Sequence, residues 1–226
     1  MRRRDLIGGL ALAATSVPAL AWAAEVKSVG LTKAFPYLDA FLTYPAAKRS
    51  RFYIAFVARR GQKPAPDFRA TIVEPGGQRT PLALDHDGRL LRLPTLAELH
   101  GGGTLECDAA AAGDVKLSLE LRPAAPAATH VDPADLDLAI AQANAAAASI
   151  AGVMSFAIPK LDAVYFPGAG GGQTVFAGGR AAPLPVTVSQ VIGPVPYFVP
   201  ASSAGAREVV LARAPSRMLI GPHPKT

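Results

Sequence analysis

The chain has 226 residues, of which 50% are hydrophobic and 18% are charged, and its formal net charge is +6 at neutral pH. This apolar content excludes a disordered chain, and the mild positive charge gives no argument for nucleic-acid binding. The single cysteine excludes an intrachain disulfide, so the fold must be held by its hydrophobic core. Glycine and proline, at 21 residues each, favour short strands joined by turns over a helical bundle.

The first residues have the pattern of an export signal. Arg2, Arg3 and Arg4 precede an apolar stretch at residues 6–14, and Ala21-Trp22-Ala23 matches the small-x-small site of signal peptidase. We therefore predict a signal peptide at residues 1–23, cleavage between Ala23 and Ala24, and a periplasmic or secreted mature protein of net charge +4. An uncleaved anchor is the alternative, but this apolar stretch is too short to cross a hydrocarbon core of about 30 Å.

The export route stays open between two machineries. Arg3-Arg4-Asp5-Leu6-Ile7 is similar to the twin-arginine signal, which directs folded cargo. The alternative is a general secretory signal that happens to contain three arginines. No cysteine lies near the cleavage site, which argues against a lipoprotein anchor.

Residues 24–122 are predicted to form a first β-rich domain with a short N-terminal helix at residues 31–43. Residues 52–58 are apolar at every position, which predicts a central strand covered on both faces, with solvated arginines such as Arg59 and Arg60 at its ends. Asp87-Gly88 predicts a type I′ hairpin turn, and Thr95 is expected to cap a helical turn that ends at His100. Further strands are expected at residues 68–74, 79–84, 89–93, 104–107 and 115–121.

A linker rich in proline and alanine is predicted at residues 123–131. The most distinct helix of the chain follows, with Asp132 as its N-cap and Gly152 as its stop. It opens a second β-rich domain at residues 132–222, before a tail at 223–226. Its strands are expected at residues 163–166, 173–177, 197–200, 208–212 and 217–220.

The predicted fold class is α+β, with mostly antiparallel, β-sandwich-like sheets in two halves that each carry one helix. The two halves have a similar order of segments. A Gly-Gly turn followed by a Pro-Leu pair occurs at residues 76–82 and again at 178–184. Internal duplication is one explanation of this similarity, and chance recurrence in a chain so rich in glycine and proline is the other.

The chain resembles a family of exported proteobacterial proteins of uncharacterised function. The similarity lies in residues 52–57, in residues 79–82 with 87–90, in the helix around residues 141–144 and in residues 214–217. It extends over most of the mature chain. The resemblance implies export and carries no activity, cofactor or site residue.

The residues give no catalytic, cofactor or metal site. There is no Gly-x-Ser-x-Gly motif, and the four histidines, His86, His100, His130 and His223, lack zinc-ligand spacing. Cys107 is expected to be a small core residue with an unreactive thiol. The glycine-rich stretch at residues 168–172 lacks the Lys-Ser/Thr pair of a phosphate-binding loop.

One polar cluster, Asp85-His86-Asp87-Gly88, has ligand-like residues. It is similar to a fragment of a calcium loop, but the third acid and the distal glutamate are missing, which favours a plain hairpin turn. Asp85 with Glu98 and His100 would make an acid–base group only if the fold gathered them.

The predicted function is that of an exported, non-catalytic binding or envelope-associated structural module. One alternative is a hydrolase-like enzyme with a site in the cleft between the halves. Another is an accessory subunit of a twin-arginine-exported partner. The expected partner is another periplasmic or envelope protein, with no nucleic acid and no membrane span after signal cleavage.

Overall fold

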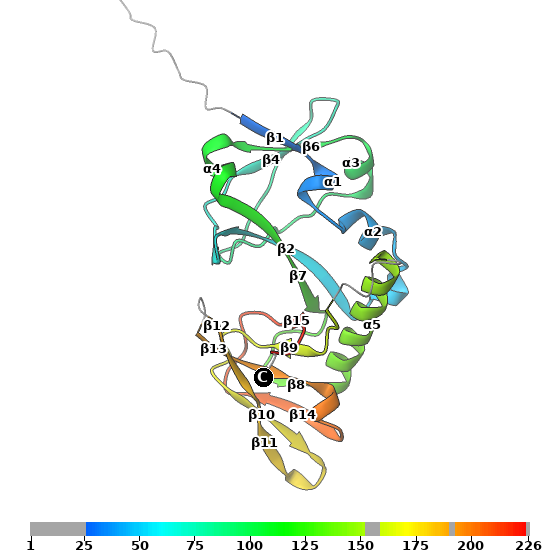
Figure 1. Cartoon of the computed structure of the whole chain (residues 1–226), viewed down its shortest axis with the longest axis vertical. Coiled ribbons are helices and arrows are strands. Elements are labelled where there is room, and N and C mark those ends of the chain that lie inside the picture. The colour runs from blue at the N-terminus through cyan, green and yellow to red at the C-terminus, as the bar shows by residue number, and fades with distance from the viewer. Residues whose placement is uncertain (1–25, 152–158, 190–192, 225–226) are drawn as a thin grey trace, which may run out of the picture.

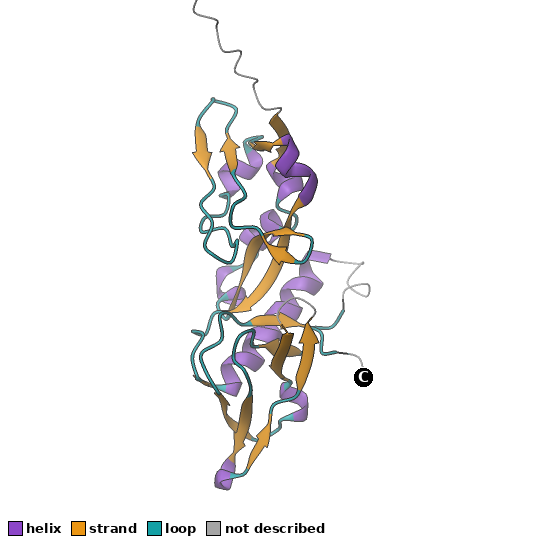
Figure 2. Ribbon diagram, turned by 90° about the vertical axis from the view of Figure 1, so that its left-hand side faces the viewer, coloured by secondary structure: helices purple, strands orange, loops and turns teal. Residues whose placement is uncertain are grey.

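The computed structural model describes residues 26–151, 159–189 and 193–224. Within these residues the strands form three sheets, and every strand pair is antiparallel. The molecule is elongated, with a four-stranded sheet at each end and a seven-stranded sheet between them (Figures 1 and 2). This arrangement confirms the predicted α+β class with mostly antiparallel sheets. No helix in the described residues is both long and apolar enough to span a membrane.

The first four-stranded sheet brings together strands that are far apart in the sequence. β4 forms a hairpin with β5 and also pairs with β6, which in turn pairs with β1. The order across the sheet is β1 (Val26–Gly30), β6 (Thr104–Asp108), β4 (Ala70–Val73) and β5 (Arg79–Pro81). β1 was not predicted from the sequence.

The second four-stranded sheet has the same layout. β10 forms a hairpin with β11 and also pairs with β14, which in turn pairs with β8. The order across the sheet is β8 (His130–Val131), β14 (Ala206–Leu211), β10 (Gly172–Phe176) and β11 (Ala181–Pro183). The segment predicted as a linker at residues 123–131 therefore contributes a short strand.

The seven-stranded sheet takes strands from both sides of that segment. β2 and β7 pair along their whole length, from Phe52 opposite Pro123 to Arg60 opposite Val115. β7 meets β15 at the pair of Leu121 and Ile220, and we call this contact the joint. The order is β12 (Val186–Ser189), β13 (Gly193–Phe198), β9 (Ala163–Tyr165), β15 (Leu219–Gly221), β7 (Val115–Pro123), β2 (Phe52–Arg60) and β3 (Lys63–Pro64).

β2 has a strand on each side, β7 and β3, although the middle strand of the whole seven-stranded sheet is β15. β2 is buried from Ile54 to Ala58, as predicted for a strand covered on both faces. The ring of Phe56 packs edge-on against Phe35 at 5.1 Å, and the ring of Phe52 packs in the same way against Phe41.

α5 and α2 cover one face of the seven-stranded sheet, whereas α1 and α4 contact strands of the first four-stranded sheet. α5 is the longest, and it contacts strands from both sides of the joint, including β2, β7, β9 and β14. The Asp132 Oδ1 accepts a 2.8 Å hydrogen bond from the Ala134 N–H, so the predicted N-cap is confirmed; the predicted stop, Gly152, lies outside the described residues. The helices are α1 (Leu31–Ala34), α2 (Leu38–Thr43), α3 (Leu96–His100), α4 (Ala109–Asp114) and α5 (Pro133–Ala151).

The single helix predicted at residues 31–43 is broken into α1 and α2. Pro36 lies in the break, where it lacks an N–H to donate and disfavours the helical conformation of the residue before it. Tyr37 follows with φ 66°, the one positive φ among the described non-glycine residues. The side chain of Tyr37 is 66% exposed, so no packing of its ring explains this conformation.

The structure confirms one predicted local motif and corrects another. Thr95 caps α3 and forms a capping box with Glu98, as predicted. The turn at residues 85–89 forms a hairpin, but Gly88 alone in that turn has a positive φ, so it is not type I′. A type I′ turn would require a positive φ at Asp87 as well.

Several backbone hydrogen bonds recur along the chain at a constant interval. The Leu82 N–H donates to the Ala70 carbonyl, and 102 residues further along, the Leu184 N–H donates to the Gly172 carbonyl. The Gly-Gly hairpins that follow β4 and β10 are closed in the same way, since the bonds from Glu74 to Gln78 and from Phe176 to Arg180 are displaced by the same interval. The terminal sheets therefore share both strand order and hairpin geometry.

Candidate functional site

The face of the seven-stranded sheet opposite α5 carries a charged cluster on β2 and β7. Alternate residues of a strand share a face, so Tyr53 and Arg59 of β2 lie on the same side as Glu120 and Arg122 of β7. The other side of these strands carries the apolar residues that contact the helices. The polar side is therefore distinct from the core.

Glu120 is at the centre of this cluster, and its side chain is only 8% exposed. Arg59 Nη2 donates to Glu120 Oε1 at 2.6 Å, while Arg122 donates to Oε2 through Nε at 3.0 Å and Nη2 at 2.5 Å. A buried carboxylate requires this kind of compensation, because its transfer from water is costly without charged partners. Both oxygens of Glu120 are thus already hydrogen-bonded by two arginines.

Arg217 approaches the same cluster from the other side of the joint, two residues before β15. Its side chain is 10% exposed. Its Nε lies 3.7 Å from Glu120 Oε1, and its Nη1 lies 4.0 Å from Asp87 Oδ2. Both distances are longer than a hydrogen bond, and the buried Nε has no hydrogen-bond partner among the described residues.

The hairpin at residues 85–89 positions Asp87 beside this cluster. Asp85 Oδ1 accepts hydrogen bonds from the backbone N–H groups of Asp87 and Arg89, and Oδ2 accepts one from Arg89 Nε at 2.9 Å. Burial alone would raise the pKa of Asp85, but these hydrogen bonds and the Arg89 charge outweigh it, so the pKa is lowered. Asp85 therefore stabilises the turn as a carboxylate.

Two cavities meet at Arg217. The first, of about 290 Å³, is lined by Tyr53, Asp85, Asp87, Arg122 and Arg217, and we call it the arginine cavity. Apolar residues complete its wall: Pro123, Ala125, Ala127 and Met218. The second, of about 470 Å³, shares Asp87, Ser216 and Arg217 with it and extends to Arg59.

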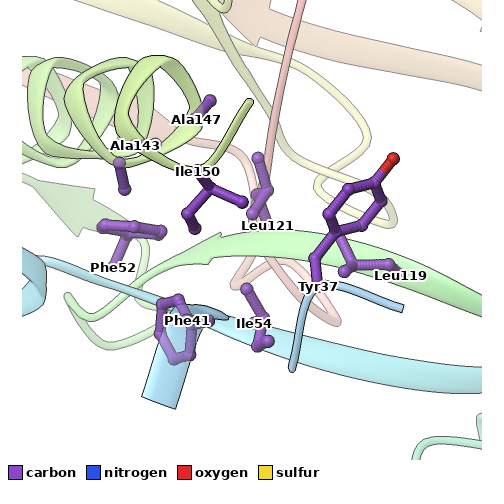
Figure 3. A pocket seen from close by; sticks show the side chains of 10 residues that line it. Tyr37, Phe41, Phe52, Ile54, Leu119, Leu121, Ala143, Ala147 and Ile150 are labelled. Carbon is purple, nitrogen blue, oxygen red and sulfur yellow. The ribbon is translucent and has the colours of Figure 1, made fainter. Parts of the chain in front are cut away.

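A third cavity lies on the opposite face of β2 and β7 and is lined almost entirely by carbon. It has a volume of about 250 Å³ and is enclosed by α2, α5 and side chains such as Phe52, Leu121 and Ile150. Figure 3 shows these side chains pointing toward one another, with the Tyr37 hydroxyl pointing away from them. An apolar group would fit this cavity, but among the described residues that line it no polar group points inward to orient a ligand.

The acid–base group considered from the sequence is not formed. Asp85 and His86 line the arginine cavity, whereas Glu98 is bound in the α3 capping box and hydrogen-bonded to Arg92. His100 Nε2 instead lies 2.8 Å from Asp39 Oδ1. In the part of the chain that the structure describes, no group of three His, Cys, Asp or Glu side chains has the geometry to hold a metal ion.

Cys107 is half-buried rather than a core residue. It lies on β6, with Sγ 3.9 Å from the Lys27 carbonyl oxygen. Burial raises the pKa of the Cys107 thiol above its usual value, although the nearby Lys27 charge acts in the opposite direction. The thiolate, which is the reactive form, is therefore disfavoured at neutral pH.

Sequence reasoning missed the residues of the arginine cavity that matter most. The charges at positions 116, 120 and 122 alternate with apolar residues on β7, which marks a polar face that could have been read as a site. No comparable pattern precedes β15 to mark Arg217. Comparisons with protein-family models, with curated proteins and with solved structures find no match.

Proposed function

We propose that this chain is an exported, non-catalytic binding protein whose ligand occupies the arginine cavity. The observation that carries this proposal is Arg217, which lines the cavity, has a side chain that is nine-tenths buried, and has an Nε without a hydrogen-bond partner among the described residues. A buried donor without a partner is costly, so a native structure that retains one calls for an explanation. A ligand that accepts the missing hydrogen bond supplies it.

The location of the cavity supports a binding role. Arg122 and Pro123 belong to β7, whereas Ser216, Arg217 and Met218 come from the segment that leads into β15. The cavity is therefore built by segments on both sides of the joint. Ligand sites form preferentially between structural units, where two sets of side chains converge on one concave surface.

We further propose that the two parts of the chain are copies of one α+β unit, each with a helix and two layers of strands. The shared strand order of the terminal sheets and the hydrogen bonds displaced by 102 residues support this duplication. In this proposal the joint corresponds to the interface of an ancestral dimer, and the arginine cavity lies beside that interface. The residues that line the arginine cavity do not occur a second time at the corresponding positions of the other copy. The proposed duplication therefore gives the chain a single cavity of this kind.

Export rests on the pattern of residues 1–23. Mature protein recovered from periplasm should begin at Ala24, as determined by N-terminal sequencing; intact Met1 in the membrane fraction would contradict both cleavage and location. Changing both Arg3 and Arg4 to lysine separates the two routes. The twin-arginine route should lose the cargo, while the general secretory route should tolerate a change that keeps the positive charge.

The binding proposal is tested by filling the cavity. Ala127 is exposed at its wall, so Ala127→Trp should obstruct the cavity without removing a core side chain, whereas Ala124→Trp adds the same ring outside it. Each protein is equilibrated with a small-molecule extract of its host cells and then analysed by native mass spectrometry. We expect a bound species in the wild type and in Ala124→Trp, and its loss in Ala127→Trp. Equal occupancy in both tryptophan variants, or an empty wild type, would reject the proposal.

The enzyme alternative gains no support from the described side chains. Glu98 is hydrogen-bonded to Arg92, and His100 lies within hydrogen-bond distance of Asp39. Asp85 accepts hydrogen bonds from backbone N–H groups of its own turn. The accessory-subunit alternative is likewise favoured by no described surface. Neither is proposed further.

A further inference from the structure

We infer that the ligand of the arginine cavity carries an oxyanion, a carboxylate or a phosphate, and that Arg217 binds it. This inference rests on the proposed binding function and adds the chemical class of the ligand. Three guanidinium groups, those of Arg59, Arg122 and Arg217, face two carboxylates, those of Glu120 and Asp87, which leaves one excess positive charge.

The excess charge belongs to Arg217 because, of the three guanidinium groups, it alone has no hydrogen bond to a carboxylate among the described residues. Glu120 Oε1 accepts from Arg59 and Oε2 accepts from Arg122, each at 3.0 Å or less. Asp87 Oδ2 lies 4.0 Å from Arg217 and 3.6 Å from His86 Nε2. A guanidinium group cannot lose its proton in a protein, so this buried charge cannot be relieved by titration.

The cavity provides the contacts that a small organic anion needs. The Nε–H and Nη–H groups of an arginine form a planar fork that matches two oxygens of a carboxylate or phosphate. Arg122 and the ring of Tyr53 line the same space, so they can contact the anionic group as well. Pro123, Ala125 and Met218 offer an apolar wall for a hydrocarbon body.

The size of the cavity indicates a small molecule. Its volume of about 290 Å³ is at the lower end of ordinary ligand pockets, which span about 300–1,000 Å³. The guanidinium group is buried rather than displayed on a surface, which is unsuited to the backbone of a nucleic acid. The inferred ligand is therefore an organic acid or a phosphorylated metabolite.

The test uses the mature full-length protein and two simple probes, sodium acetate and inorganic phosphate, with sodium chloride at matched ionic strength as the salt control. The ¹⁵N resonance of Arg217 Nε is followed by NMR, and affinity is measured by calorimetry. Acetate or phosphate, but not chloride, should shift the Arg217 Nε–H resonance to a saturating value. A preference for acetate indicates a carboxylate ligand, and a preference for phosphate indicates a phosphate ligand.

Two variants make the assignment specific. Arg217→Ala should weaken binding of the preferred probe about tenfold or more, since a hydrogen bond between charged groups is lost. Arg217→Lys keeps the charge but lacks the fork, so its affinity should fall between those of the wild type and Arg217→Ala. Arg207→Ala removes an exposed arginine from β14 and should leave affinity unchanged.

Several results would overturn the inference. One is an Arg217 Nε–H resonance that does not shift with either acetate or phosphate in the wild type. Another is an affinity for the preferred probe that is unchanged in Arg217→Ala. If Arg217→Ala fails to fold, the wild-type resonance and Arg217→Lys still decide the matter. The wild type could instead bind a neutral ligand that is lost in Ala127→Trp, while neither acetate nor phosphate binds. That result would reject this inference and leave the proposed binding function intact.

Discussion

Leu121 of β7 and Ile220 of β15 lie directly opposite each other, and among the described residues this pair alone joins the two strands. Each has a corresponding neighbour on its other side: Leu121 pairs with Ile54 of β2, and Ile220 pairs with Val164 of β9. In the duplication proposed above, these would be equivalent strands of the two copies, meeting as at the interface of a symmetric dimer.

The first prediction concerns the core beneath this sheet. Phe56 is fully buried and packs against the ring of Phe35, so Phe56→Ala should lower the free energy of unfolding by about 3–5 kcal/mol. Leu91→Ala is the control, because Leu91 is 57% exposed and its removal leaves no cavity. Urea melts of the two variants give the comparison. Similar stabilities for both would mean that Phe56 is not part of the packed core.

The second prediction separates two neighbouring arginines of β2 that the sequence presents alike. Arg59 hydrogen-bonds the buried Glu120, so Arg59→Ala should cost about 1–3 kcal/mol. Arg60 pairs with Asp67 in solvent, and Arg60→Ala should leave the urea midpoint within experimental error. The expectation that both are solvated strand-end charges is therefore wrong for Arg59. A smaller loss for Arg59→Ala than for Arg60→Ala would contradict the described cluster.

The third prediction concerns the turn that places Asp87. Gly88 has φ +73°, and a Cβ at this position would lie 2.8 Å from the Ala58 carbonyl oxygen and 3.1 Å from the Ala65 nitrogen. Gly61 has φ +60° but open space around it, so Gly61→Ala should cost only the strain of a positive φ, about 1–2 kcal/mol. Gly88→Ala should cost distinctly more in thermal melts. Equal costs would show that the hairpin does not press against β2.

The fourth prediction concerns pH. Burial would raise the pKa of Glu98, but the Thr95 N–H, the Arg92 guanidinium and the Thr95 hydroxyl outweigh it and lower that pKa. A carboxyl whose pKa is lowered by folding stabilises the protein above its unfolded pKa, about 4.3, and this contribution disappears as pH falls through the folded pKa. Glu98→Gln should therefore destabilise the protein at neutral pH, and its difference from the wild type should shrink in acid. A difference that is independent of pH would show that Glu98 does not act through its charge.

Local interactions account for what was predictable from the sequence. The caps at Thr95 and Asp132 depend on residues two or three positions away, so the pattern alone identified them. The break at Pro36 was missed because proline is tolerated in the first turn of a helix, and the apolar residues after it have helical spacing. Strands as short as β8 have too few residues to show alternation.

The candidate site depended on contacts that no local pattern encodes. Glu120 and Arg217 are brought together only by the register at the joint, which depends on pairing between distant parts of the chain. The turn at residues 85–89 was correctly predicted as a hairpin, yet its role beside Arg217 follows from tertiary packing. The sequence did not indicate that strands before and after residues 123–131 belong to one sheet, because the proline and alanine residues of this segment are typical of a linker between domains.

The order of strands in the seven-stranded sheet has a consequence for how the protein is made. β15 follows every other described strand in the chain, yet it occupies the middle of the sheet between β9 and β7. While residues 219–221 are still inside the ribosome or a translocation channel, β7 and β9 each expose an unpaired edge, and such edges attract other chains. A chain delivered unfolded across a membrane would pass through this stage outside the cytoplasm, where a holding chaperone would be needed. A chain delivered already folded would complete the sheet before crossing.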